Sequence, residues 1–271
     1  MMHASTTYTA AEGAGYERNM GRWSRQLALP FLDFAGTGAR ERVLDVGCGT
    51  GALSAQLLAR EASCEVHAVD LTPAYVAHAH RHLPPPRPAL AVGDACALPY
   101  RDGVFDRVLS LLVLHFVPRP AQAVAQMVRV ARPGATVAAA VWDARGGFVA
   151  GRMFFDTAAA LDPGAAQQRA RNFTRPMTRP GELAAAWREA GLVEVEQTQV
   201  GIRMVFADFE DYWSPYLGKD GPGAAYVAGL DAAARARLEA AMRAAYLDGE
   251  ADGPRAYAAL AWAVKGRVPP A

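Results

Sequence analysis

The chain has 271 residues, which is enough for one large domain with a sizeable core. Its residues are 52% hydrophobic and 20% charged, close to the usual globular mix, so a disordered chain is excluded. The 28 lysines and arginines balance 27 aspartates and glutamates, so no bulk charge draws the chain to nucleic acid or to an anionic membrane.

The three cysteines, Cys48, Cys64 and Cys96, form no C-x-x-C pair. A disulfide framework and a cysteine zinc site are therefore not expected, which favours a reducing, cytoplasmic location. Residues 1–15 have neither the basic nor the apolar region of a signal peptide, and we interpret them as a flexible N-terminus. No apolar run approaches the ~18–20 residues of a membrane span, so no membrane partner is expected.

After residue 15, apolar residues at helical spacing predict an amphipathic helix at Gly21–Phe34. Short apolar runs then alternate with helix-like segments. The predicted strands are Arg42–Val46, Glu65–Asp70, Ala89–Val92, Phe105–Ser110 and Thr136–Trp142. The predicted helices between them are Ala52–Arg60, Pro73–His82 and Ala121–Ala131. This alternation is typical of βαβ units and predicts an α/β fold with a doubly wound sheet.

The pattern changes after Asp143. Residues 144–180 and 208–253 are rich in aromatic and arginine residues or in helix formers, without strand character, and we interpret them as helical lid insertions. The elements between and after them are a helix at Gly181–Ala190 and strands at Val193–Val205 and Ala256–Val268. The sequence therefore predicts a seven-stranded, Rossmann-like sheet in a single domain over residues 16–271.

The most informative segment is Val43–Gly51, with the sequence VLDVGCGTG, in which a predicted strand runs into three glycines. Glycines there tolerate positive φ and let the backbone approach a ligand at the start of the next helix. Gly47, Gly49 and Ala52 also satisfy G-x-G-x-x-A, so the loop alone fits a dinucleotide equally well. No Lys-Ser or Lys-Thr follows the glycines, which excludes a P-loop.

Three acids at predicted strand ends narrow the choice of ligand. The carboxylate of Asp45 would repel a pyrophosphate but would attract a ligand with a cationic ammonium and sulfonium. Asp70 ends the second strand 70 − 51 = 19 residues after the last glycine, where an acid that bridges two ribose hydroxyls is expected. Asp94 ends the third strand between the small residues Gly93 and Ala95, where an adenine ring would fit.

Four motifs in order carry a resemblance: VLDVGCGTG, AVDLTP, VGDACALPY and FDRVLSLLVLHFV. They resemble the motifs of the class I S-adenosylmethionine-dependent methyltransferases, most closely the small-molecule group called methyltransferase type 11 or UbiE-like. The N-terminal YERNMGRWSRQLA resembles bacterial members of that group. The resemblance covers residues 16–143 and is weak beyond them. It implies S-adenosyl-L-methionine as cofactor, S-adenosyl-L-homocysteine as product, and methyl transfer to an oxygen, nitrogen or carbon atom.

By position, the resemblance assigns Gly47 and Gly49 to the methionine moiety, with Asp45 near its ammonium. Asp70 would hold the ribose diol. The other cofactor contacts that it implies are Leu71, Asp94 and Ala95 at the adenine, Leu111 near the methionine, and Tyr16, Arg22 and Trp23 from the N-terminal helix. Arg22 would pair with the cofactor carboxylate. Asp45 as a buried structural carboxylate and Trp23 as a core residue remain alternatives.

His115, just past the fourth predicted strand, is the candidate catalytic residue. Displacement at a sulfonium methyl group needs mainly alignment, and a base is required only if the acceptor must lose a proton. An unperturbed histidine pKa near ~6.5 suits that task, although a histidine packed under a lid is an equal alternative. His78 and His82 have the i, i+4 spacing of metal ligands, but no carboxylate or cysteine completes the set, so no metal is expected.

The two insertions should supply the acceptor site. Their aromatic density predicts a lid over a small, apolar or aromatic acceptor, although rings that only attach the lid to the core are an alternative. The predicted substrate-binding residues are Trp142, Phe148, Arg152, Phe155, Trp213 and Tyr216.

Two other functions stay open. An NAD-dependent oxidoreductase would need a Y-x-x-x-K set, which the tyrosines do not provide, and a non-catalytic S-adenosylmethionine-binding protein is also compatible with the motifs. A nucleic-acid methyltransferase is disfavoured because LLVLHF stands where an (N/D)PPY motif would be. The oligomeric state is open between a monomer and a homodimer.

Overall fold

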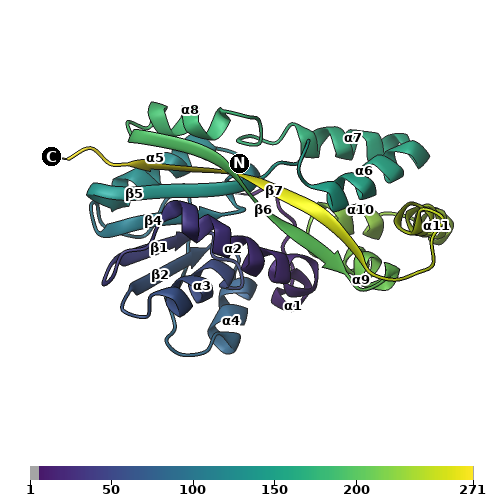
Figure 1. Ribbon diagram of the computed structural model, residues 1–271, viewed down its shortest axis with the longest axis horizontal. Coiled ribbons are helices and arrows are strands. Elements are labelled where there is room, and N and C mark those ends of the chain that lie inside the picture. Colours follow the sequence, from purple (N-terminus) through teal and green to yellow (C-terminus); the bar gives the residue numbers. More distant parts are fainter. Residues whose placement is uncertain (1–5, 271) are drawn as a thin grey trace.

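The structure, a computed structural model, describes residues 6–270. Seven strands form one sheet in the order β3-β2-β1-β4-β5-β7-β6 (Figure 1). They are β1 (Arg42–Val46), β2 (Glu65–Asp70), β3 (Ala89–Val92), β4 (Phe105–Leu111), β5 (Ala131–Trp142), β6 (Val193–Phe206) and β7 (Arg255–Arg267). The first five run parallel, and β7 runs antiparallel to both β5 and β6. The predicted α/β fold with a seven-stranded, doubly wound sheet is confirmed.

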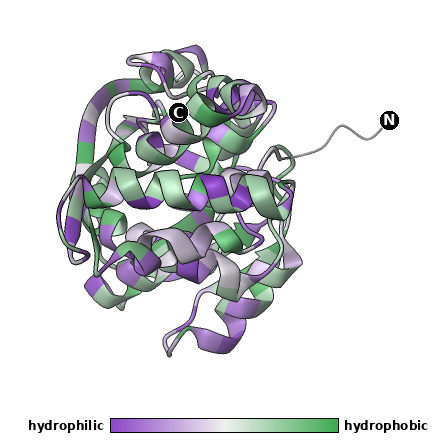
Figure 2. Ribbon diagram, turned by 90° about the vertical axis from the view of Figure 1, so that its right-hand side faces the viewer, coloured by the Kyte–Doolittle hydropathy of each residue, from purple (hydrophilic) through white to green (hydrophobic). Residues whose placement is uncertain are grey.

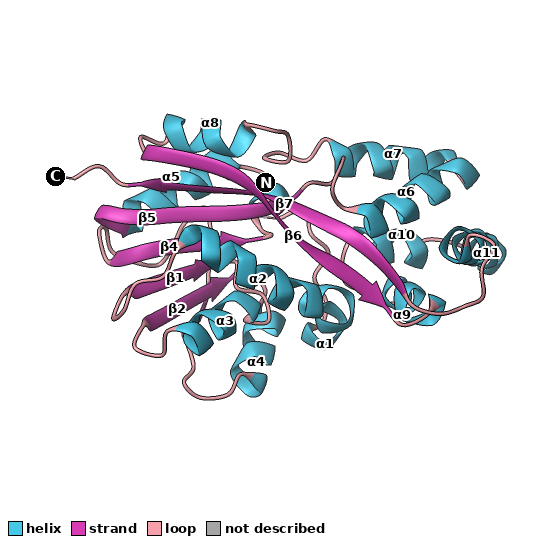
Figure 3. Cartoon of the chain, viewed as in Figure 1, coloured by secondary structure: helices cyan, strands magenta, loops and turns pink. Residues whose placement is uncertain are grey.

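Helices cover both faces of the sheet (Figure 3). They are α2 (Arg22–Ala35), α3 (Ala52–Arg60), α4 (Pro73–His82), α5 (Pro120–Val130) and α8 (Glu182–Glu189). Side chains alternate along β1 because successive residues of a strand point to opposite faces. Val43 belongs to the core under α2 and α3, whereas Leu44 and Val46 belong to the core that contains Met127 of α5 and Trp187 of α8. Burial on both faces explains the nearly continuous apolar strands.

The remaining helices gather beyond the carboxyl ends of the parallel strands, at the right of Figure 1. They are α6 (Val149–Leu161), α7 (Pro163–Phe173), α9 (Phe209–Trp213), α10 (Pro222–Ala228) and α11 (Ala232–Leu247). All five lie within the two segments for which the sequence predicts insertions. Figure 2 looks onto this end, where hydrophobic and hydrophilic residues alternate along the helices. Phe154, Trp213 and Tyr246 are fully buried in the α2–α3 core, so the insertions share a core with the sheet.

The N-terminal segment packs against the same end of the molecule. Of the predicted flexible residues 1–15, the first five lie outside the described residues. Thr7 donates its backbone N–H to Phe116 O at 2.8 Å, and Ala11 donates to the Asp220 carboxylate at 2.8 Å. The short helix α1 (Gly13–Tyr16) and a π-helical turn at Glu17–Gly21 then lead into α2. Residues 6–15 are thus in contact with the fold.

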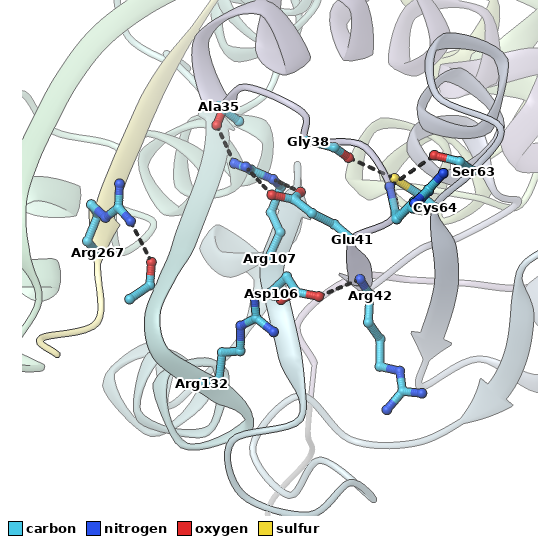
Figure 4. Close-up of polar contacts among 12 residues, drawn as sticks. Ala35, Gly38, Glu41, Arg42, Ser63, Cys64, Asp106, Arg107, Arg132 and Arg267 are labelled. Carbon is cyan, nitrogen blue, oxygen red and sulfur yellow. Dashed lines mark hydrogen bonds and ion pairs between the residues drawn. The ribbon is translucent and has the colours of Figure 1, made fainter. Parts of the chain in front are cut away.

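Charged side chains pair near the amino ends of β1 and β4, at the end of the sheet away from the insertions (Figure 4). Arg107 of β4 is 8% exposed and donates to both carboxylate oxygens of Glu41, at 2.7 and 2.9 Å, and to Ala35 O at 2.6 Å. The neighbouring Asp106 accepts the backbone N–H of Arg42 at 2.7 Å. These contacts fix the connection from α2 into β1. Because each of these side chains has a hydrogen-bond partner within the chain, we interpret this group as structural.

No helix within residues 6–270 is long and apolar enough to cross a membrane.

Candidate active site

The loop between β1 and α3 has the backbone that its glycines predict. Gly47 and Gly49 have φ of +76° and +56°, in the left-handed region that favours glycine. A Cβ on Gly47 would lie 2.4 Å from the Val113 side chain, so no larger residue fits there. The backbone N–H groups of Gly47 and Cys48 both donate to Val69 O, at 2.7 and 3.0 Å. The loop is therefore fixed against the end of β2.

Asp70 lies where β2 ends and joins this loop. Its Oδ2 accepts the backbone N–H of Gly49 at 2.8 Å, and its Oδ1 accepts that of Thr72 at 2.8 Å. Burial raises the pKa of Asp70, and the two backbone donors act in the opposite direction. Each carboxylate oxygen has two lone-pair sites, so both oxygens can still accept from ligand hydroxyls. Asp94, after β3, accepts the backbone N–H of Cys96 at 2.8 Å.

Asp45 is the buried acid that precedes the loop. It is 1% exposed, and the Ser54 hydroxyl donates to its Oδ2 at 2.7 Å. Its Oδ1 has no hydrogen-bond partner in the described chain. Burial raises the pKa of Asp45 to about 7. An unpaired buried carboxylate oxygen is costly, and a cationic ligand group nearby would compensate it.

One cavity follows the carboxyl ends of β1 to β5 and continues under the insertions. The predicted cofactor-binding residues that line it are Tyr16, Gly47, Gly49, Asp70, Leu71, Asp94, Ala95 and Leu111. The candidate catalytic residue His115 also lines it. The predicted substrate-binding residues that line it are Trp142, Phe148, Arg152, Phe155 and Tyr216. In open α/β sheets of this kind, ligands bind at the carboxyl ends of the strands.

A known protein family matches the segment that contains the glycine loop, Asp70 and Asp94. Residues 44–139 match the model of a family described as a methyltransferase domain. This match supports, over these residues, the resemblance to the class I S-adenosylmethionine-dependent methyltransferases.

Two curated relatives each match more than a third of the chain. The malonyl-[acyl-carrier protein] O-methyltransferase of Halorhodospira halophila is 41% identical over 97 residues, which are 35% of this chain and 33% of that protein. The demethylmenaquinone methyltransferase of Beutenbergia cavernae is 39% identical over 105 residues, 38% of this chain and 41% of that protein. The chain thus spans about a third to two fifths of the length of these relatives.

A solved structure extends the likeness to the whole fold. Phosphoethanolamine N-methyltransferase 2 of Haemonchus contortus, in complex with S-adenosyl-L-methionine, has a TM-score of 0.57 and 15% identity. The similarity covers 96% of this chain and 57% of that chain. At this identity the similarity shows the fold alone.

Four predicted site residues are not in the lining of the cavity: Asp45, Arg22, Trp23 and Trp213. Arg22 forms an ion pair with Asp211 at 2.9 Å, and its guanidinium lies 4.1 Å from the ring centroid of Trp23. The structure therefore pairs Arg22 with the insertion instead of directing it to a cofactor carboxylate.

Trp23 and Trp213 are core residues. Trp23 is 2% exposed and packs against the Phe206 ring, with centroids 5.2 Å apart. Trp213 is fully buried and stacks on Phe209. Both rings attach the helices to the sheet, which is the alternative that the sequence left open for them.

His115 sits on a 3-10 turn at Leu114–Phe116, directly after β4. It is 4% exposed, and its Nδ1 has no hydrogen-bond partner among the described residues. Burial, with a smaller contribution from the charge of Arg175, lowers the pKa of His115 to about 3. The imidazole is therefore neutral at neutral pH.

Several residues that line the cavity were not predicted as site residues from the sequence: Tyr8, Asn19, Tyr75, Asn172 and Arg175. The Tyr75 hydroxyl donates to Asp220 at 2.6 Å, which links α4 to the loop before α10. The Tyr8 ring meets the Phe116 ring edge-on, with centroids 4.8 Å apart. Of this group, Asn172 and Arg175 lie in residues 144–180, where the aromatic and arginine content indicated a lid; no sequence signal indicated the other three.

Proposed function

We propose that the protein is an enzyme that transfers the methyl group of S-adenosyl-L-methionine to an oxygen, nitrogen or carbon atom of a small, apolar or aromatic acceptor. The observation that carries this proposal is the continuous cavity. At one end are Gly49, Asp70 and Asp94, and at the other end are aromatic side chains such as Phe148 and Tyr216. A cofactor and an acceptor can therefore meet in one enclosure.

The residues at the first end fit S-adenosyl-L-methionine. Both oxygens of Asp70 keep free lone pairs for the ribose hydroxyls, and Gly49 leaves its surroundings open, with no atom closer than 3.9 Å to an added Cβ. The unpaired Oδ1 of Asp45 would be compensated by the cofactor's cationic groups. A pyrophosphate would instead add negative charge to a cavity lined by Asp70 and Asp94, with Asp45 buried nearby, which disfavours a dinucleotide.

Methyl transfer from a sulfonium requires mainly that the acceptor atom be aligned with the methyl group. S-adenosyl-L-methionine, when bound, supplies a methyl group activated by its sulfonium. The chain's own contribution is to hold the acceptor in line and to exclude water, which can be worth up to ~7–11 kcal/mol of barrier. Because its lowered pKa makes His115 a weak proton acceptor, we assign it the role of orienting the acceptor through its Nδ1, with base catalysis as the lesser role.

The relatives named above act, by their names, on a malonyl group of a carrier protein and on demethylmenaquinone. The lid helices of this chain lie outside residues 44–139, so the acceptor class rests on the aromatic lining of the lid and on no relative. All three cysteines are free and buried, which supports a cytoplasmic location as a further proposal. For the oligomeric state we propose a monomer or a homodimer, which light scattering distinguishes.

Calorimetric titration with S-adenosyl-L-methionine, S-adenosyl-L-homocysteine and NAD tests the proposal. We expect roughly micromolar binding of the first two, a range typical of enzyme ligands, and none of NAD. Asp70→Asn should weaken the binding strongly, whereas Asp33→Asn, at an exposed acid on α2, should not. Binding of NAD alone would overturn the proposal. Tight binding of the cofactor without any formation of S-adenosyl-L-homocysteine over a broad acceptor panel would favour the non-catalytic alternative.

A further inference from the structure

The lid end of the cavity contains a cation without a carboxylate partner. Arg175 lies between α7 and α8 and lines the cavity, with its guanidinium 4.4 Å from the centroid of the Phe116 ring. Its hydrogen bonds within residues 6–270 go to Thr7 Oγ1 at 2.9 Å and to Asn172 Oδ1 at 2.9 and 3.2 Å. Burial lowers the pKa of Arg175 to about 10, which leaves it charged at neutral pH. Three of its five N–H donors are used, so two remain.

Two buried polar groups beside Arg175 are also without a partner. Asn172 is 5% exposed, and its Nδ2 makes no hydrogen bond in the described chain. His115 is 4% exposed, and the same holds for its Nδ1. Both residues line the cavity. Buried polar groups are rarely left unpaired, because each one costs about 1–3 kcal/mol, so a group of them around one cavity indicates a ligand that supplies the partners.

The charges along the cavity are segregated. Asp70 and Asp94 lie at the ends of β2 and β3, and Arg152 and Arg175 lie in the first insertion. Arg152 pairs with Asp156, with 2.8 Å between its Nη2 and the carboxylate, and Arg169 pairs with the same carboxylate. Among the described residues, Arg175 is thus the lining arginine without a carboxylate partner, and its charge disfavours a cationic acceptor.

We propose that the methyl acceptor carries a carboxylate, which Arg175, Asn172 and His115 bind at the lid end of the cavity. A carboxylate offers two oxygens with about four lone-pair sites, which matches two guanidinium N–H groups, one amide and one imidazole N–H. Its negative charge would pair with the guanidinium of Arg175. The acceptor class is therefore an aromatic or alkyl carboxylic acid. This inference rests on the proposed function, because it names the acceptor of the same site.

The test compares acids with their uncharged amides, which have nearly the same shape. Benzoate, 2-naphthoate and hexanoate, with the three matching amides and benzylamine, are titrated into wild-type protein saturated with S-adenosyl-L-homocysteine. We expect at least one acid to bind about 10-fold or more tightly than its amide, and benzylamine to bind least. Arg175→Gln should remove that preference, and Arg175→Lys should restore part of it. Arg171→Gln, at an exposed arginine on α7, is the matched control and should change nothing.

Equal binding of acids and amides by the wild type, or the absence of binding by all three acids, would overturn the inference whether or not the variants fold. An equal loss for acids and amides in Arg175→Gln would also overturn it. Binding of S-adenosyl-L-homocysteine is recorded separately in each protein. Its absence in the wild type would contradict the proposed function, and the acid preference is then measured on the protein alone, so the two failures are distinguishable.

Discussion

Replacing Asp45 by asparagine should make the protein more stable and a weaker binder of the cofactor. Asp45 is 1% exposed, one of its oxygens has no hydrogen-bond partner among residues 6–270, and burial raises its pKa to about 7. An asparagine keeps the shape and can keep the bond to Ser54, but it removes the charge. The buried carboxylate is thus a feature that lowers stability and serves a ligand.

The size of the effect follows from the pKa. An acid whose pKa is raised in the folded protein is harder to ionise there, so stability falls as pH rises between the ordinary value of 3.8 and about 7. At about 1.4 kcal/mol for each tenfold change, the full penalty above pH 7 is about 4 kcal/mol. At pH 5 the penalty is still between about 1 and 2 kcal/mol. The advantage of Asp45→Asn should therefore grow by about 2–3 kcal/mol from pH 5 to pH 8.

Urea unfolding of both proteins at the two pH values measures this difference, with Asp33→Asn as the control at an exposed acid. Calorimetry on the same samples should show weaker binding of S-adenosyl-L-methionine to Asp45→Asn at pH 8. A variant that is less stable than the wild type at pH 8, or an advantage that does not change with pH, would refute the reasoning.

Three further outcomes are expected. The imidazole of His115 should stay neutral, because burial lowers its pKa to about 3, so its NMR resonances should not titrate between pH 5 and 8; a midpoint near 6.5 would contradict its burial. Gly47→Ala should lower the free energy of unfolding by about 2–4 kcal/mol, since its φ is +76° and its Cβ would collide with a valine, whereas Gly134→Ala, at φ +80° in open space, should cost about 1 kcal/mol. Similar costs would show that the collision is relieved. Arg107→Met should cost about 2–4 kcal/mol because it leaves a carboxylate unpaired, while Arg42→Met, in an exposed pair, should cost less than about 1 kcal/mol by urea unfolding. Equal costs would mean that burial adds nothing to the Arg107 pair.

The strands and the acids at their ends were predictable from the sequence because their signals are local. Buried parallel strands require apolar runs, and the helix predicted at Ala52–Arg60 begins and ends where α3 does. Asp70 and Asp94 follow from a rule of the fold, since carboxyl ends of parallel strands share one edge. Gly47 and Gly49 have positive φ, and glycine at both positions indicates this backbone from the sequence alone.

The lid end was not predictable in the same way, because its contacts join residues far apart in the chain. Arg22 pairs with Asp211, which is 189 residues away, so no nearby residue indicates that partner. Arg175 likewise contacts Thr7, which is 168 residues away, and the Phe116 ring, which follows β4. Aromatic density predicted a lid but could not separate rings that line the cavity, such as Phe148, from rings that fill the core.

The central claim is tested most directly by a crystal structure of the protein with S-adenosyl-L-homocysteine. We predict that the ribose hydroxyls lie within hydrogen-bond distance of Asp70, that the adenine lies beside Asp94, and that the sulfur faces the side of the cavity that holds His115. Electron density for the ligand outside this cavity, or inside it with no contact to Asp70, would contradict the account.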